Sequence, residues 1–353
     1  MLLQRRAKPV IGLDITTSSI KLIELSRSGD SYRVESYAAE PSPPNAINEK
    51  AIVDAQAVGE AVRRAVKRAG ARSGEVAIAI SGDAAITKVI QMPRSLRDSE
   101  LESQVEMQAD QYIPFPMEEV SFDFEVIGAS EKDPDMYDVL LVATRSENVE
   151  QRQAAVQAAG LSTRIVDVEA FALENSCRLL THQMPDGGID RYIAVIDFGA
   201  SSTTFSVLRN LKVTYTRDFA FGGQQLTEEI MRSYGLSMEE AGRAKKEGGL
   251  PANYQAEVLD PFIDDMCQQV SRSLQFFLAS GAGREQPEQI LICGGCANIP
   301  GAAEMIQSRV GIESQRGDPL GQMKVSQKAK AQAVKKDATA LLTACGLALR
   351  SFD

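Results

Sequence analysis

The chain of 353 residues carries 38 lysines and arginines against 48 aspartates and glutamates, a formal net charge of −10 at pH 7. Binding to a nucleic-acid backbone requires a basic surface, so this charge argues against a nucleic-acid partner. Five cysteines and a single histidine, His182, argue against a disulfide framework, a histidine-based zinc site and a serine hydrolase triad. Because no apolar run of about 18 residues and no secretory signal is found, we expect a cytoplasmic protein without a membrane span.

Strands and helices are predicted to alternate along the chain, which is typical of an α/β fold. Short apolar runs predict strands at residues 10–14, 20–25, 76–80, 87–91, 139–143, 193–197, 203–208, 213–217 and 290–293. Helical periodicity predicts helices at residues 54–68, 98–112, 148–159, 169–180, 224–233, 253–277 and 335–349.

The first strand pair is repeated half a chain later. Residues 10–25 align without gaps on residues 193–208, with a shift of 197 − 14 = 183 positions, so that Asp14 falls on Asp197. Ser18 and Ser19 fall on Ser201 and Ser202. Each segment reads as an apolar strand, an aspartate, a turn of small residues and a second strand, so the sequence predicts two β-hairpins of one design.

Each hairpin turn offers a carboxylate beside several backbone N–H groups. Such runs of N–H groups bind anions, phosphate above all, and a neighbouring carboxylate can hold Mg²⁺. Two facing hairpins would therefore clamp a polyphosphate from both sides. The alternative is that each turn is only a tight hairpin whose aspartate caps its own backbone, and the duplication favours the clamp.

A third element is the apolar strand that ends in Gly294 and Gly295. Glycines leave room for a flat ring to lie on the backbone. Cys293 and Cys296 frame these glycines as C-x-x-C, a spacing also used in redox and zinc sites. Because there is no second C-x-x-C and no thioredoxin-like context, we favour the ring-binding interpretation.

The two hairpins and the glycine pair, in this order, resemble the phosphate 1, phosphate 2 and adenosine motifs of the actin/Hsp70/hexokinase superfamily. The resemblance implies an α/β actin-like ATPase fold with two halves around a cleft for ATP and Mg²⁺. It implies subdomain 1A at residues 1–83, 161–189 and 335–353, an inserted subdomain 1C at 84–160, subdomain 2A at 190–221 and 284–334, and subdomain 2B at 222–283.

The resemblance also assigns roles to residues. Asp14 and Asp197 would hold Mg²⁺ through water, and Glu169 would orient the attacking water, although a carboxylate at a helix start is also simply a favourable partner of the helix dipole. Thr16 and Gly242 stand where relatives have a glycine and a glutamate, so we expect slow ATP hydrolysis at most. The implied nucleotide-binding set is Asp14, Ser18, Ser19, Lys21, Asp197, Gly199, Ser201, Ser202, Gly222, Gly223, Lys245, Gly294 and Gly295.

The inserted segment indicates which branch of the superfamily the chain resembles. Residues 92–128 resemble the inserted subdomain of the FtsA-like branch, and QYIPFPMEEV with GLDITTSSIKLIEL resembles the PilM family of type IV pilus assembly. This implies docking of the cytoplasmic N-terminal peptide of a PilN-like inner-membrane protein, and coupling to pilus motor ATPases or a platform protein. We expect the peptide at Met92, Arg94, Tyr112, Ile113 and Phe115, with closure of the insert's own core as the alternative role of the apolar members.

The end of the chain bears on membrane attachment. Residues 333–350 are expected to form the second helix that crosses the hinge, which leaves no room for the terminal membrane-binding helix of division-type FtsA proteins. Recruitment to the membrane through a partner is then the simpler account. A sugar or acetate kinase and a filament-forming cell-division actin remain the alternatives, and self-association stays open.

Overall fold

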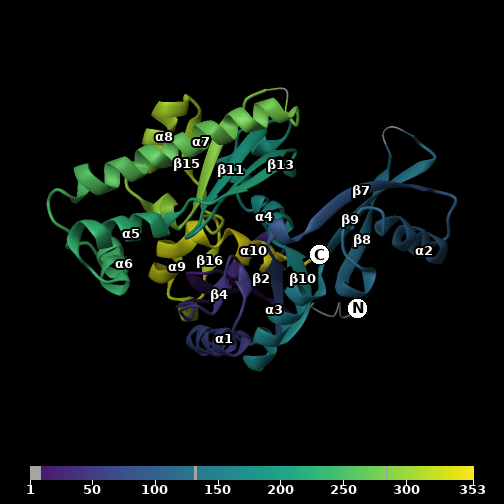
Figure 1. Cartoon of the computed structure of the whole chain (residues 1–353), viewed down its shortest axis with the longest axis horizontal. Coiled ribbons are helices and arrows are strands. Elements are labelled where there is room, and N and C mark those ends of the chain that lie inside the picture. Colours follow the sequence, from purple (N-terminus) through teal and green to yellow (C-terminus); the bar gives the residue numbers. More distant parts are fainter. Residues whose placement is uncertain (1–8, 131–132, 284) are drawn as a thin grey trace.

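The computed structural model describes residues 9–130, 133–283 and 285–353, arranged as two halves with an insert on the first (Figure 1). The first half is built on a sheet of strand order β10-β6-β1-β2-β3-β16. The first three strands in the chain form an antiparallel meander, and the next two lie parallel beside it. The strands are β1 (Ile11–Ile15), β2 (Ser19–Ser28), β3 (Ser31–Pro41), β6 (Glu75–Ile80), β10 (Ser162–Val168) and β16 (Lys324–Val325).

The second half repeats this plan. Its sheet has the order β13-β12-β11-β14-β15, again with an antiparallel meander of three strands followed by two parallel strands. The predicted duplication of one hairpin is therefore part of a duplicated sheet. The strands are β11 (Tyr192–Phe198), β12 (Thr203–Arg209), β13 (Lys212–Phe219), β14 (Gln289–Gly294) and β15 (Glu313–Arg316).

Helices cover both sheets because their apolar faces are buried against the strands. In the first half, α1 (Ala55–Ala69) is capped by the Asp54 carboxylate, which accepts the backbone N–H of Ala57 at 2.9 Å. Beside α1 lies α3 (Ser146–Ala158), and a short hairpin of β4 (Ile47–Asn48) and β5 (Ala51–Ile52) precedes α1. The second half carries α5 (Gly223–Tyr234), α6 (Met238–Glu247), α7 (Asp260–Ser280), which follows a π-helical turn, and α8 (Ala302–Val310).

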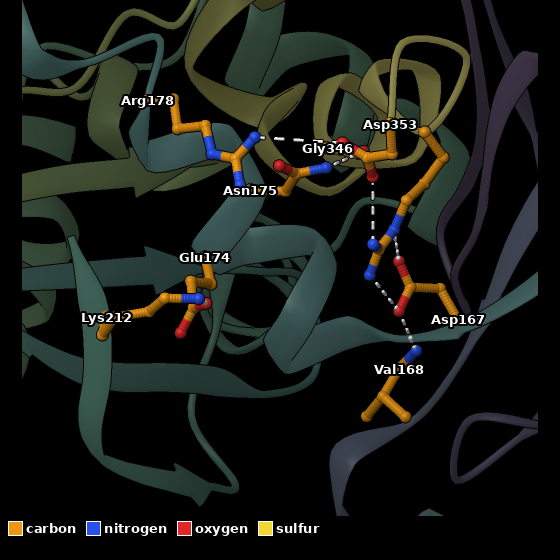
Figure 2. A network of polar contacts seen from close by, with 9 residues as sticks. Asp167, Val168, Glu174, Asn175, Arg178, Lys212, Gly346 and Asp353 are labelled. Atoms are coloured by element: carbon orange, nitrogen blue, oxygen red, sulfur yellow. Dashed lines mark hydrogen bonds and ion pairs between the residues drawn. The ribbon is translucent and has the colours of Figure 1, made fainter. Parts of the chain in front are cut away.

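Two helices join the halves at the centre of the molecule. α4 (Glu169–Cys177) and α10 (Leu342–Leu349) cross in contact, and a side chain on Gly346 would overlap the carbonyl group of Ala172. Figure 2 shows polar contacts around this crossing, including the amide of Asn175, which donates to the Gly346 carbonyl at 3.3 Å. Apolar residues of α4 and α10 also pack against β11 and β14 of the second half.

The insert is a separate layer that extends away from the two halves in Figure 1. Its sheet has the order β7-β9-β8, from β7 (Ile86–Pro93), β8 (Val120–Ala129) and β9 (Met136–Arg145), and α2 (Asp98–Ala109) packs on it. Helix α2 begins at Asp98, as predicted, and is capped by Arg97, whose backbone N–H donates to the Glu100 carboxylate at 3.0 Å. It ends at Ala109, three residues before the predicted end at residue 112.

The structure shifts two expected domain boundaries. Helix α3 packs on α1 in the core of the first half, where Gly59 allows close approach to Ala158, so the insert runs from about residue 86 to residue 145 rather than 84–160. Strand β16 pairs with β3, so residues near 324 belong with the first sheet and not with the second half. In both cases tertiary packing decided the boundary.

The structure also corrects several predicted elements. The expected helix at 335–349 is broken into α9 (Ala331–Asp337) and α10 by a 3₁₀ turn at Ala338–Ala340. The Thr339 hydroxyl in this turn donates to the Gly294 carbonyl at 3.0 Å, which gives the interruption a tertiary partner. Strands β3, β8, β10 and β15 and helix α6 were not predicted. None of the helices in the described parts of the chain is long and apolar enough to cross a membrane.

Candidate functional site

The two predicted hairpins meet turn to turn. The hydroxyl groups of Thr17 and Ser201 lie 3.2 Å apart, although 184 positions separate them. Each turn is closed by the same bond, from the backbone N–H of Thr16 to the Ser19 carbonyl at 3.1 Å and from that of Gly199 to the Ser202 carbonyl at 3.0 Å. The repeat in the sequence is therefore a repeat in backbone geometry.

Both turns keep backbone N–H groups available. Within the described residues, the N–H groups of Thr17, Ser18, Ala200 and Ser201 donate to no acceptor. Unpaired N–H groups at adjoining turns are the donors that phosphate oxygens accept from. The carbonyl groups of the second turn, in contrast, are hydrogen-bonded. Those of Gly199 and Ala200 accept the backbone N–H groups of Gly223 and Gln224, at the start of α5, at 3.0 and 2.8 Å.

The aspartate of the first hairpin has a paired cation. Asp14 and Lys21 face each other across β1 and β2, and their side chains form an ion pair of 2.7 Å in which both are largely buried. Burial lowers the pKa of Lys21, but Asp14, with help from Asp197 and Glu169, outweighs burial and raises it above its usual value. Lys21 therefore carries its charge between three carboxylates.

The aspartate of the second hairpin lacks such a cation. The residue across from Asp197 is Thr204, and within the described residues the Asp197 carboxylate makes no hydrogen bond. Burial raises the pKa of Asp197 to about 6, an effect that Lys21 partly offsets and Asp14 reinforces. A cation or ordered water beside this carboxylate would stabilise its charged form.

Glycines keep the backbone beside Asp197 free of side chains. Gly294 has φ +83°, and a side chain there would overlap Phe198 and the Asp197 carboxylate. A Cβ on Gly295 would meet nothing within 4 Å, so there is open space beside this loop.

The Lys245 ammonium reaches the Gly223 carbonyl at 2.7 Å and the Thr227 hydroxyl at 2.6 Å, so it binds the beginning of α5.

Glu169 lies at the start of α4, close to both hairpins, and it is paired with a residue that the sequence analysis missed. The Lys50 ammonium lies 3.2 Å from a Glu169 oxygen and 3.2 Å from an oxygen of Asp218 in β13. Burial raises the pKa of Glu169, and Lys50 offsets part of that rise. No sequence signal pointed to Lys50 or Asp218, because they come from segments 168 positions apart.

Comparison with known proteins identifies the family. Residues 12–352 match the family model described as type IV pilus assembly protein PilM. The chain belongs to the PilM family. A solved PilM–PilN type IV pilus biogenesis complex matches with a TM-score of 0.80 and 28% identity, over 98% of this chain and 99% of that chain. The chain thus has the actin-like ATPase fold that the hairpins predicted.

More distant relatives agree with this assignment. The cell division protein FtsA of Bacillus subtilis is 25% identical over 355 residues, which cover 86% of this chain and 78% of FtsA. The structure of the ethanolamine utilization protein EutJ from Carboxydothermus hydrogenoformans matches with a TM-score of 0.56 and 18% identity, over 97% of this chain and 90% of EutJ. The predicted relation to the FtsA-like branch and to PilM is confirmed.

The residues of this PilM-family chain fit a magnesium nucleotide better than a directly held metal. Within the described residues, no group of three or more His, Cys, Asp or Glu side chains is placed to bind an ion. If Mg²⁺ binds here with the nucleotide, Asp14 and Asp197 are the carboxylates that could reach it through water, with phosphates as further ligands. The free N–H groups of the turns and the open space at Gly295 are the matching features for phosphate and adenosine.

The C-x-x-C spacing has no redox character in this structure. Cys293 and Cys296 are free and buried, and burial raises the pKa of both thiols, that of Cys296 to about 11. A reactive cysteine needs the opposite shift. The Cys296 sulfur faces the Gly199 carbonyl at 3.9 Å, so it packs against the second turn.

The five residues predicted to bind a partner peptide separate into two groups. Met92 and Ile113 are buried in the core of the insert. Arg94 and Tyr112 are exposed, and Phe115 is half-buried with the Arg145 guanidinium 4.7 Å from its ring centre. The peptide prediction in this PilM-family chain therefore depends on Arg94, Tyr112 and Phe115, because Met92 and Ile113 are core residues of the insert.

Proposed function

We propose that this PilM-family protein is an ATP-binding scaffold on the cytoplasmic side of the type IV pilus machine. In this proposal, Mg·ATP lies between the two hairpins, and the insert docks the N-terminal cytoplasmic peptide of a PilN-like membrane protein. The observation that carries the partner is the match over nearly the whole chain to a PilM–PilN complex. The protein would couple that complex to pilus motor ATPases or a platform protein, and would reach the inner membrane through its partners.

The nucleotide half of the proposal is supported by the two turns. Their free N–H groups adjoin Asp14 and Asp197, and Gly222, Gly223, Gly294 and Gly295 keep side chains out of the adjoining loops. Ser18, Ser19, Ser201 and Ser202 supply hydroxyl groups at the same turns. Anion-binding backbone and carboxylates at one place are what a magnesium polyphosphate requires.

A thermal shift experiment tests nucleotide binding. Mg·ATP at about 100 times its dissociation constant stabilises a protein by roughly 2.7 kcal/mol, which raises the melting temperature measurably. Asp197→Ala should abolish the shift, whereas Asp30→Ala, which removes a fully exposed aspartate on the β2–β3 turn, should leave it intact. An equal shift in Asp197→Ala and in the unmodified protein would contradict binding between the hairpins.

We expect ATP to be hydrolysed slowly, because phosphoryl transfer depends on fine positioning and two positions depart from the family pattern. Gly242 in α6 is one of them, and a Cβ there would meet nothing within 4 Å. Gly242→Glu should therefore be accommodated and should tighten nucleotide binding, measured by calorimetry. Steady turnover near the 1–100 s⁻¹ of ordinary kinases, stimulated by a sugar or acetate, would instead favour the kinase alternative.

The partner half is tested by titrating the N-terminal peptide of the PilN protein from the same organism. We expect moderate affinity, because an extended peptide gains main-chain hydrogen bonds and pocket contacts but loses conformational entropy. Phe115→Ala should weaken binding without lowering the melting temperature by more than a few degrees. Glu106→Lys on the exposed side of α2 is the matched control and should change affinity only modestly. A lower melting temperature with unchanged affinity would make Phe115 a core residue only.

A further inference from the structure

Lys50 connects three segments that are remote in sequence. It lies on the turn between β4 and β5, and its ammonium is 3.2 Å from Glu169 at the start of α4 and 3.2 Å from Asp218 on β13. Lys50 belongs to the first half and Asp218 to the second half. The contact to Asp218 is therefore an ion pair between the halves, next to the hairpin turns.

Both ends of this ion pair are fixed by other contacts. The Lys50 backbone has φ +68°, a left-handed conformation that residues other than glycine seldom adopt, and its carbonyl accepts the guanidinium of buried Arg152 at 2.9 Å. At the other end, the second oxygen of Asp218 accepts the Thr204 hydroxyl at 2.6 Å. Ion pairs between flexible surface groups contribute little because both side chains must be ordered, and here the Lys50 backbone and the Asp218 side chain are already held in place.

Removing the charge of Lys50 would leave two neighbouring carboxylates without their shared cation. The side chains of Lys50, Glu169 and Asp218 are 19%, 25% and 28% exposed, so the two carboxylates are only partly solvated. Lys50 separates them, and without its charge they would repel each other across the boundary between the halves. That repulsion and the loss of the bridge both act to open the molecule.

We propose that Lys50 is a latch that holds the two halves together at the hairpin turns and positions Glu169 there. The latch closes the protein when no nucleotide is bound. Its effect on Glu169 rests on the proposed nucleotide function, whereas its effect on closure does not. Failure of the latch and failure of nucleotide binding are therefore distinguished by measuring closure on nucleotide-free protein.

The chain offers a matched control. Lys212 on β13 forms an ion pair of 2.7 Å with Glu174 on α4, so it joins the same strand and the same helix as the latch (Figure 2). The Lys212 side chain is 73% exposed, and its partner lies further along α4 from the hairpin turns. Lys212→Met removes an ion pair between β13 and α4, the two elements that carry the partners of Lys50, and leaves Lys50 unchanged.

The experiment measures the distance between the halves by single-molecule fluorescence transfer, with dyes on Lys67→Cys in α1 and Glu239→Cys in α6. All five native cysteines are buried, so the dyes should react with the two introduced cysteines. Without nucleotide, Lys50→Met should raise the population of open molecules roughly five- to tenfold, as expected for a partly buried ion pair. Salt should open the unmodified protein toward the same distribution, because it screens the pair, and Lys212→Met should leave the distribution unchanged.

A double-mutant cycle decides whether the pair itself is responsible. Asp218→Asn should also open the protein, but less than Lys50→Met because it leaves no pair of uncompensated carboxylates, and the double variant should open it no further than Lys50→Met. Unchanged distances in Lys50→Met, additive effects in the double variant, or equal opening in Lys212→Met would overturn the latch. If Lys50→Met does not fold, the nearly isosteric Asp218→Asn decides alone, and a closed distribution in that variant would equally overturn it.

Discussion

The two hairpins share a backbone and differ in charge. Asp14 and Asp197 occupy the same register position at the ends of β1 and β11, and both turns are closed by the same backbone bond. Across the strand pair, however, Asp14 faces Lys21 whereas Asp197 faces Thr204. The first hairpin neutralises its aspartate internally, and the second leaves its aspartate without a cation.

This difference shows that two copies of one hairpin can take different roles, one with a paired aspartate and one with an unpaired aspartate. In the first hairpin Asp14 and Lys21 compensate each other's buried charge, and Lys21 places a cation beside the turns. In the second, Thr204 turns its hydroxyl to Asp218 and so contributes to holding Lys50 from the other half. The unpaired Asp197 is the position where charge is available for a ligand, at some expense in stability.

The largest expected effect comes from breaking the internal pair. Asp14→Ala leaves the buried Lys21 ammonium without its partner, and breaking a buried ion pair in this way lowers the free energy of unfolding by about 3 kcal/mol. Urea unfolding followed by circular dichroism measures it. The double variant Asp14→Ala with Lys21→Met should recover most of the loss, and a double variant as unstable as Asp14→Ala would show that the pair is not the cause.

An intermediate effect is expected from the turn residues that differ, Thr16 and Gly199. A Cβ on Gly199 would lie 2.7 Å from the Ser202 carbonyl oxygen, so Gly199→Ala should lower the free energy of unfolding by about 2 kcal/mol, in the range of overpacking changes. The first turn already holds a side chain, whose hydroxyl donates to the Ser19 carbonyl at 2.8 Å. Thr16→Gly, measured by the same urea unfolding, should cost about 1 kcal/mol. Equal tolerance of Gly199→Ala and Thr16→Gly would mean that the two turns are not differently packed.

The smallest expected effect is a gain in stability, from Asp197→Asn. The pKa of Asp197 is about 6 in the folded protein against an ordinary value of 3.8, so ionisation of Asp197 opposes folding. This penalty is absent below pH 3.8 and develops as the pH rises through about 6. Asp197→Asn should therefore raise the free energy of unfolding by about 1 kcal/mol at pH 8, less at pH 5.

Thermal melts of Asp197→Asn from pH 5 to pH 8 check this sign. The partial exposure of Asp197 and its proximity to Lys21 limit the gain in stability, which should grow from pH 5 to pH 8. A loss of stability at pH 8 comparable with that of Asp14→Ala would mean that Asp197 also has an internal partner, and the contrast between the hairpins would fail.

The sequence located the hairpins, the glycine pair and the family, because each of these is a local pattern of strand, aspartate and small residues. It missed β3 and β8, although Phe122 and Phe124, both half-buried, alternate with exposed polar residues along β8 as expected for a strand. It also predicted one helix at 335–349, which an apolar stretch with helical residues favours locally. Contact of Thr339 with Gly294, from the other half, accompanies the break in that helix.

What the sequence by itself determined is the chemistry available at each turn, since a strand, its turn and its return strand lie within sixteen residues and fix their own register. The tertiary structure alone decided which charges meet. Lys50 reaches Glu169 over 119 positions and Asp218 over 168, and such contacts depend on how the halves and α4 pack together. Charge acts through space, so the same two aspartates have different surroundings that no pattern along the chain encodes.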